Sequence, residues 1–239
     1  MNDDGVKLGK EYVKYISGIN HLEPSVLMYG STVYGKISSD LDVSLVVKDF
    51  SREDFDKLKR MTIDFQKQNG LSLDEEVPYE SKLMYREADV EEMLKNSPFQ
   101  KIDGVYKITP VEKSKDFLSS KEMKYRLLLN ILTTRSLLLA GDSEKIKAYK
   151  QKAWELLVDV IMSYNKLEEV KIDHFLELLY KDEKTGHEGE MFLGYKDNIP
   201  QKKNDLAEDC ESTFWRLTQE GKMRRIDTDR YIPAKDKER

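Results

Sequence analysis

Small polar and acidic residues between positions 26 and 47 have types and spacing that suggest phosphate chemistry. A short apolar run ends at Gly30-Ser31, and an acid-apolar-acid triplet, Asp40-Leu41-Asp42, then opens a second apolar run. Because alternate side chains of a strand share a face, the two carboxylates should point the same way. Such a pair repels itself unless a cation lies between its members, and Mg²⁺ is commonly held by one or two carboxylates plus substrate phosphates. The segment therefore predicts a divalent cation and a phosphate-bearing substrate.

The surrounding sequence predicts the elements that position these residues. Their expected ranges are a helix at 7–19, strands at 26–29, 40–48 and 71–77, and a helix at 51–70. Ser51 is expected to cap the second helix, and Gly70 to end it. In the third strand, Asp74 and Glu76 lie on the face opposite the apolar side chains. The order is therefore helix, strand, strand, helix, strand, which predicts an α+β domain.

Helical patterns dominate the chain after a domain boundary that we expect near residue 118. Before it, a short helix near 89–95 and a strand near 105–108 are expected. After it, the expected helices cover 120–139, 143–164, 172–180 and 201–218. Ser143 should cap the second of these, and the charged segment after Arg230 should fray. We therefore divide the chain into an α+β domain (1–118), a helical domain (119–230) and a charged tail (231–239).

Composition narrows the class of protein. A chain of 239 residues can bury a core without disulfides, and its single cysteine, Cys210, predicts a reducing, cytoplasmic setting. The N-terminus lacks a secretory signal pattern, and no apolar run is long enough to span a bilayer. The net charge of −5 does not favour a protein that coats nucleic acid. With three histidines and one cysteine, any metal should be a hard cation bound by oxygen rather than zinc.

Two motifs resemble those of the nucleotidyltransferase superfamily, whose fold is shared by polymerase-beta-like enzymes and by antibiotic and minimal nucleotidyltransferases. The family pattern is an apolar residue, Gly, then Gly or Ser, a spacer, and acid-apolar-acid-apolar. Tyr29-Gly30-Ser31 and Asp40-Leu41-Asp42-Val43 match it in order and spacing. A third acid on a later strand is the remaining hallmark, which Asp74 matches best, with Glu76 as its rival. The resemblance is specific over residues 7–80 and loose over the helical half.

This resemblance implies a nucleotidyltransferase-type mixed sheet with flanking helices, followed by a C-terminal helical bundle. It also implies two Mg²⁺ ions and a nucleoside triphosphate, with transfer of a nucleoside monophosphate to a hydroxyl. Asp40, Asp42 and Asp74 would then bind the metals. Either Asp74 or Glu76 could also accept the proton of the attacking hydroxyl. The Gly30-Ser31 turn would contact the leaving pyrophosphate.

Several cations are further candidates for phosphate binding. Lys82 and Arg86 follow the third expected strand, although such side chains more often form a solvated face. Arg126 and Arg135 are nine residues apart in one expected helix and cannot share a face, so at least one should be structural. We retain Lys82 and Arg135 as candidates, the latter because a guanidinium fits phosphate well. The glycine-punctuated segment 186–195 is either a substrate loop or an ordinary connector.

The identity of the acceptor leaves three functions open. The intact acidic set and the absence of a basic excess favour an enzyme that modifies a small hydroxyl-bearing molecule, such as an antibiotic. The same fold could instead modify tRNA, other RNA or a protein, as toxin-like and regulatory adenylyltransferases do. A basic patch near Asp40 would favour RNA as the acceptor. A non-catalytic nucleotide-binding module is the third alternative, against which the intact acidic pair argues.

Overall fold

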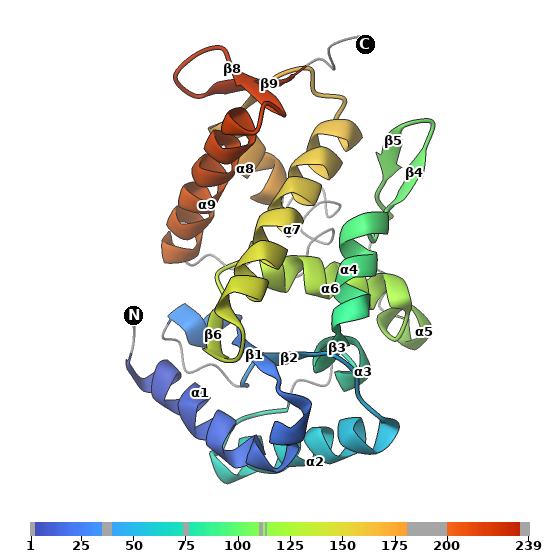
Figure 1. The fold of residues 1–239 in the computed structure, drawn as a ribbon, viewed down its shortest axis with the longest axis vertical. Helices are drawn as coiled ribbons and strands as arrows, with labels where there is room; N and C mark the ends of the chain where they lie inside the picture. The colour runs from blue at the N-terminus through green and yellow to red at the C-terminus, as the bar shows by residue number, and fades with distance from the viewer. Residues whose placement is uncertain are drawn as a thin grey trace.

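A four-stranded mixed sheet lies at the centre of the α+β fold (Figure 1). The computed structural model describes residues 3–34, 40–73, 77–109, 112, 114–180 and 200–234. The sheet has the order β3-β2-β1-β6 and is built from β1 (Ser25–Met28), β2 (Val43–Val47), β3 (Met84–Arg86) and β6 (Leu137–Ala140). β1 is antiparallel to β2 and to β6, whereas β2 and β3 are parallel. The predicted fold class is confirmed at this level.

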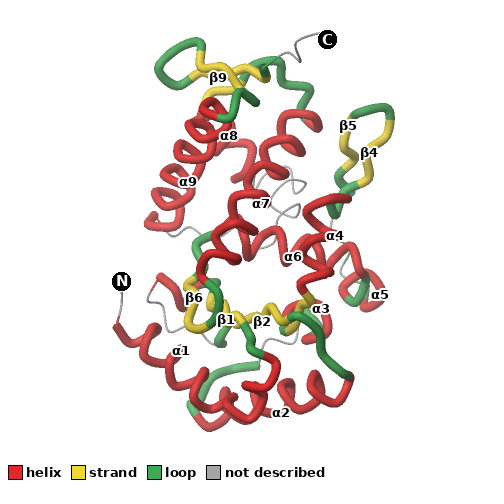
Figure 2. Tube along the Cα trace, viewed as in Figure 1, coloured by secondary structure: helices red, strands yellow, loops and turns green. Residues whose placement is uncertain are grey.

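Helices cover both faces of the sheet (Figures 1 and 2). On one face lie α1 (Asp3–Tyr15) and α2 (Arg52–Gln68); on the other lie α4 (Glu87–Asn96), α6 (Lys121–Thr133) and α7 (Ser143–Tyr164). Alternate residues of β1 enter different cores: Met28 packs with the α1–α2 side, and Leu27 with the α6–α7 side. The sheet is therefore buried on both faces, as its continuous apolar strands require.

The remaining elements extend the fold on either side of the sheet. They are η1 (Ile16–Leu22), η2 (Ser31–Tyr34), α3 (Tyr79–Lys82), β4 (Gln100–Ile102), β5 (Val105–Lys107), α5 (Lys115–Leu118), β7 (Val170–Lys171), α8 (Ile172–Tyr180), α9 (Pro200–Gln219), β8 (Met223–Arg225) and β9 (Arg230–Pro233). β4 and β5 form a hairpin, and β7, β9 and β8 form a small antiparallel sheet at the end of the molecule farthest from α2 (Figure 1). Within the described ranges, no helix is both long and apolar enough to cross a membrane.

Both ends of α2 are capped by the residues that the sequence predicted, Ser51 and Gly70. The cap at the C-terminal end also explains why the expected third strand does not begin at Leu71. Ser51 accepts a hydrogen bond from the Asp54 amide and completes a capping box. At the other end Gly70 adopts a φ of +68°, and the Leu71 amide bonds back to the Gln66 carbonyl at 2.9 Å. This is a Schellman termination, which uses the Leu71 amide before it can join a sheet. Residues 71–73 therefore do not form a strand, and residues 74–76 lie outside the described residues. The third strand along the chain is instead β3, which pairs with β2.

The expectation of one helix over 120–139 was wrong. α6 ends at Thr133, Thr134 is extended, and Leu137–Ala140 forms β6 against β1. A short apolar run does not by itself distinguish strand from helix, because the distinction depends on its partner. Here β1 would otherwise expose unpaired backbone groups along its edge, and β6 pairs with them. The boundary near residue 118 stays a prediction, and β6 from beyond it completes the central sheet.

Two smaller expectations also need correction. α7 spans the predicted residues, but its N-cap is Asp142, which accepts from the Lys145 amide at 2.9 Å, rather than Ser143. The residues directly after Arg230 do not fray, because they form β9. Tyr231 is buried there, with its ring centroid 5.0 Å from that of Phe214. An aromatic side chain that packs into the core outweighs the charge of the residues around it.

Candidate functional site at the edge of the central sheet

The β1–β2 pair brings the Gly-Ser turn and the acidic pair together. The Tyr29 amide donates to the Asp42 carbonyl at 3.0 Å, so pairing continues past the ends of both strands. The acidic pair therefore lies directly before β2 rather than within it. Leu41 and Val43 are buried, as the alternation predicted, while Asp40 and Asp42 are half-buried. The two carboxylates thus remain accessible at the edge where the turn begins.

Gly30 lies directly against the Asp42 carboxylate. Its φ is +71°, and a Cβ at this position would be 2.0 Å from Asp42 Oδ2. The left-handed backbone and the close approach both require glycine. The turn that follows, η2, begins at Ser31 and is held by two hydrogen bonds: from the Val33 amide to the Gly30 carbonyl, and from the Thr32 hydroxyl to the Asp40 carbonyl, both at 3.3 Å. The turn and the acidic pair form one structural unit.

The other two strands bring candidate cations to the same edge. The parallel pairing of Leu45 with Met84 places Lys82 beside the start of β2, where the Ser44 hydroxyl donates to the Lys82 carbonyl. The antiparallel pairing of Met28 with Leu137 places residue 135 beside the end of β1. The strand register alone therefore brings the acidic pair, the Gly-Ser turn, Lys82 and Arg135 to the same edge of the sheet.

Asp40, Asp42 and Lys82 line one small pocket of about 10 Å³, which has room for roughly one water-sized group. Two residues that the sequence analysis did not single out, Thr62 and Gln66 of α2, also line it. Both are buried, and Thr62 shares a 2.8 Å hydrogen bond with the Tyr12 hydroxyl. They are polar residues four positions apart on the apolar face of α2, which is the sequence signal that could have found them.

The oxygen atoms around this pocket suit a hard cation. Asp40 and Asp42 contribute carboxylates, and the buried Gln66 Oε1 accepts no hydrogen bond from any described residue. Carboxylate and amide oxygens are ligands that Mg²⁺ accepts, whereas soft metals prefer sulfur or imidazole. The part of the chain that the structure describes contains no group of three carboxylate, histidine or cysteine side chains arranged for a metal. The two candidates for the third acid, Asp74 and Glu76, lie outside the described residues.

Arg135 lies at the edge of the site but is already paired. Its Nη1 is 2.6 Å from Asp205 Oδ2 of α9, and this hydrogen bond raises the pKa of the guanidinium. The Lys150 ammonium donates to the Ser136 carbonyl at 3.0 Å, and burial lowers its pKa. Lys150 lies close enough to Arg135 for their charges to interact, so it is a second cation at this edge that the sequence did not indicate.

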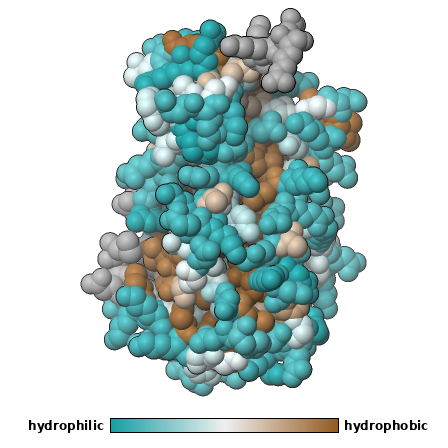
Figure 3. Space-filling view, viewed as in Figure 1, coloured by the Kyte–Doolittle hydropathy of each residue, from teal (hydrophilic) through white to brown (hydrophobic). Residues whose placement is uncertain are grey.

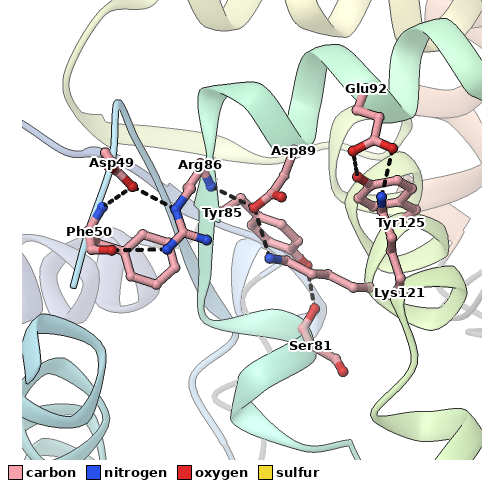
Figure 4. A network of polar contacts seen from close by, with 10 residues as sticks. Asp49, Phe50, Ser81, Tyr85, Arg86, Asp89, Glu92, Lys121 and Tyr125 are labelled. Carbon is pink, nitrogen blue, oxygen red and sulfur yellow. Dashed lines mark hydrogen bonds and ion pairs between the residues drawn. The ribbon is translucent and has the colours of Figure 1, made fainter. Parts of the chain in front are cut away.

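Two other arginines have structural roles. Arg86 Nε donates to Asp49 Oδ1 at 2.6 Å, and its guanidinium stacks on the Phe50 ring at 4.2 Å (Figure 4). Arg126 is fully buried and donates to the Thr109 carbonyl at 2.7 Å. The inference that at least one of the arginines on the expected helix is structural is therefore confirmed for Arg126. The contacts of Arg86 with Asp49 and Phe50 give it a structural role at the end of β3.

A network of polar contacts, which includes Arg86, joins α4 to α6 and to the end of β3 (Figure 4). Asp89 accepts from the Arg86 amide at 3.0 Å and from the Lys124 ammonium at 2.8 Å. Burial alone would raise the pKa of Asp89, but these two hydrogen bonds and the positive charges of Lys124 and Arg86 together outweigh burial, and the pKa is lowered. One turn further along α4, Glu92 accepts from Lys121 at 2.6 Å. These contacts hold α4, which directly follows β3, against α6.

Comparison with known proteins does not assign the chain to a family. No family model, curated protein or solved structure matches it. The candidate loop at 186–195 lies outside the described residues. The functional interpretation therefore depends on the residues and geometry at the sheet edge.

Proposed function

We propose that this protein is a Mg²⁺-dependent nucleotidyltransferase that moves a nucleoside monophosphate from a nucleoside triphosphate to a hydroxyl of a small molecule, such as an antibiotic. The observation that carries the proposal is the contact between the Gly30 backbone and the Asp42 carboxylate. It joins a glycine turn and a carboxylate pair into one unit. Phosphoryl transfer needs such a unit, because cation ligands must lie beside groups that position the phosphates.

Each candidate residue has a role in this proposal. Asp40, Asp42 and the third acid, Asp74 or Glu76, would bind two Mg²⁺ ions. When bound, these ions neutralise charge on the transferring phosphate and stabilise its entering and leaving oxygens. The third acid would also accept the proton of the acceptor hydroxyl. The Gly30-Ser31 turn would contact the pyrophosphate that leaves.

The cations at the edge support this division of roles. Lys82 lines the same pocket as the acidic pair, and it would balance the charge of the triphosphate. Arg135 approaches from the helical half and would exchange part of its contact with Asp205 for phosphate oxygens. In the same proposal, the central sheet is of the nucleotidyltransferase type and α6 to α9 form the helical bundle of such enzymes. The single cysteine, which is buried, fits a cytoplasmic setting.

A transfer assay tests the reaction and the acceptor together. Each of the four nucleoside triphosphates, labelled at the α-phosphate, is incubated with the protein, Mg²⁺ and separate small-molecule, RNA and protein fractions of a cell extract. We expect labelled small molecules and released pyrophosphate, both lost in Asp42→Ala and kept in Asp64→Ala, an exposed acid of α2. Label on RNA or protein would replace the proposed acceptor, and transfer that survives Asp42→Ala would remove the proposed site.

A further inference from the structure

A second and larger pocket lies between the α4–β5 segment and the C-terminal elements, and it shares no residue with the sheet-edge pocket. Its volume is about 620 Å³, and its lining comes from α4, β5, α7, α9, β8 and β9. Figure 3 shows apolar surface in the recess between the upper part of the molecule and the β4–β5 hairpin. Concave pockets of this size with an apolar lining and a few polar groups are typical of small-molecule sites.

The floor of this pocket is apolar and adaptable. Leu156 and Met162 contribute from α7, Leu217 from α9 and Met223 from β8. Each of these side chains is less than a tenth exposed, so together they offer a recessed surface rather than a scattered exposed patch. Methionine is unbranched and polarizable, and two methionines let the floor fit ligands of different outline.

The two acids of the pocket are already compensated by the protein. Glu155 forms an ion pair with Lys222 at 2.7 Å and a further hydrogen bond with Arg216. Asp159 accepts from the Tyr106 hydroxyl at 3.0 Å. Burial raises the pKa of Tyr106 to about 12, so the phenol stays neutral and remains a donor to Asp159 at physiological pH. Neither acid needs a cationic ligand.

The lysines of the pocket differ from the acids. Lys95, in the last turn of α4, and Lys152 of α7 both line it and are exposed. Among the residues that the structure describes, neither lysine has an ion-pair or hydrogen-bond partner. The pocket therefore carries an excess of positive charge although the whole chain has a net charge of −5. A local excess of one sign attracts ligands of the other.

We propose that this pocket binds a small amphipathic carboxylate: an apolar chain or ring that bears one anionic head. The apolar body would lie on Leu156, Met162 and Leu217, where it replaces water on recessed apolar surface. The head would lie between Lys95 and Lys152, which supply two ammonium groups without breaking an existing ion pair. The site does not depend on the sheet-edge chemistry.

Calorimetric titration of the full chain with decanoate, below its micelle concentration, tests the proposal. Two probes with the same chain serve as controls, neutral decanol and cationic decyltrimethylammonium. We expect saturable binding of decanoate at least tenfold tighter than that of either control. Substitution of both lysines, Lys95→Gln with Lys152→Gln, should weaken decanoate binding at least tenfold, because it removes the charge and leaves the floor intact.

Lys147→Gln is the matched control variant, since Lys147 is an exposed lysine of α7 outside the pocket lining. It should bind decanoate as the unaltered protein does. Three outcomes would each overturn the proposal: the absence of saturable decanoate binding, equal affinity for decanoate and decyltrimethylammonium, or unchanged decanoate affinity in the Lys95 and Lys152 double variant. Because the double variant changes only exposed side chains, we expect it to fold as the unaltered protein does, and its unfolding curve checks this.

Discussion

At the scale of single residues, the candidate site depends on the absence of a Cβ atom at Gly30. Gly30 and Gly70 have nearly the same positive φ, +71° and +68°. A Cβ on Gly30 would collide with the Asp42 carboxylate, whereas a Cβ on Gly70 would meet nothing within 4 Å. The two positions therefore separate backbone strain from the contact that joins the turn to the acidic pair.

Alanine at these two glycines gives the first prediction. Gly70→Ala should lower the free energy of unfolding by roughly 1–2 kcal/mol, the usual cost of a left-handed non-glycine residue. Gly30→Ala should cost about 1 kcal/mol more, because Asp42 must also move. Urea unfolding measures both, and the extra cost should shrink in an Asp42→Ala background. Equal costs for the two glycines would show that the contact with Asp42 does not constrain the turn.

Lys82 and Arg86 give the second prediction at this scale. Lys82 lines the pocket of the acidic pair, whereas Arg86 is committed to Asp49. Lys82→Gln should weaken binding of a Mg²⁺-nucleoside triphosphate at least tenfold, which is about 1.4 kcal/mol. Arg86→Gln should leave that affinity unchanged in the folded protein. Calorimetric titration distinguishes them, and a similar loss in both variants would argue against a specific role for Lys82.

At the scale of elements, the local sequence predicts some helices and strands, whereas others form only through pairing with distant parts of the chain. α2, α7 and α8 could be predicted because 3.6-residue periodicity marks them in the sequence, and Ser51 and Gly70 also mark the two ends of α2. β6 could not, because its four apolar residues become a strand only through pairing with β1, far away in the chain. The same holds for the candidate site. Gly30 and Asp42 belong to motifs that lie close together in the sequence, whereas Gln66 reaches the site only because of how α2 packs against the sheet.

A cross-strand disulfide tests the placement of β6. Directly opposed residues of antiparallel strands have Cα atoms roughly 4.5–5.5 Å apart, which fits a disulfide. With Cys210→Ser as background, Met28→Cys with Leu137→Cys should therefore oxidise, since these positions are paired. Met28→Cys with Leu138→Cys is the control, because neighbouring side chains of a strand point to opposite faces. Non-reducing gel mobility distinguishes them, and equal oxidation of both pairs would contradict the register.

The N-terminus of α4 gives a prediction about pH. Because the pKa of Asp89 is lowered in the folded protein, its ionised form stabilises the fold above the unfolded value of about 3.9. That contribution is lost as the pH falls through the lower folded pKa. Asp89→Asn should therefore cost about 1 kcal/mol at pH 7 and much less at pH 3, as measured by urea unfolding.

The neighbouring acid of α4 is the control for this experiment. Glu91 is exposed, and Glu91→Gln should change the free energy of unfolding little at either pH. A cost of Asp89→Asn that does not vary between pH 7 and pH 3 would mean that the carboxylate charge is not what stabilises the start of α4.

At the scale of the whole molecule, the central sheet organises the proposed chemistry. The ends of its four strands gather an acidic pair, a glycine turn, Lys82 and Arg135 at one edge, and helices cover both of its faces. These residues come from strands or flanking turns that are widely separated in the chain. An edge where carboxylates and cationic side chains meet can bind a metal cation and an anionic substrate together, as the proposed function requires.

Joint binding of metal and nucleotide is measured by calorimetric titration with the four nucleoside triphosphates, first in Mg²⁺ and then in excess chelator. We expect at least one nucleotide to bind in Mg²⁺, and its affinity to fall at least tenfold on removal of the metal. Asp42→Asn, which keeps the shape of the side chain and removes its charge, should cause a similar loss in the presence of Mg²⁺. Nucleotide binding that needs neither Mg²⁺ nor the Asp42 charge would contradict the proposed metal and nucleotide site.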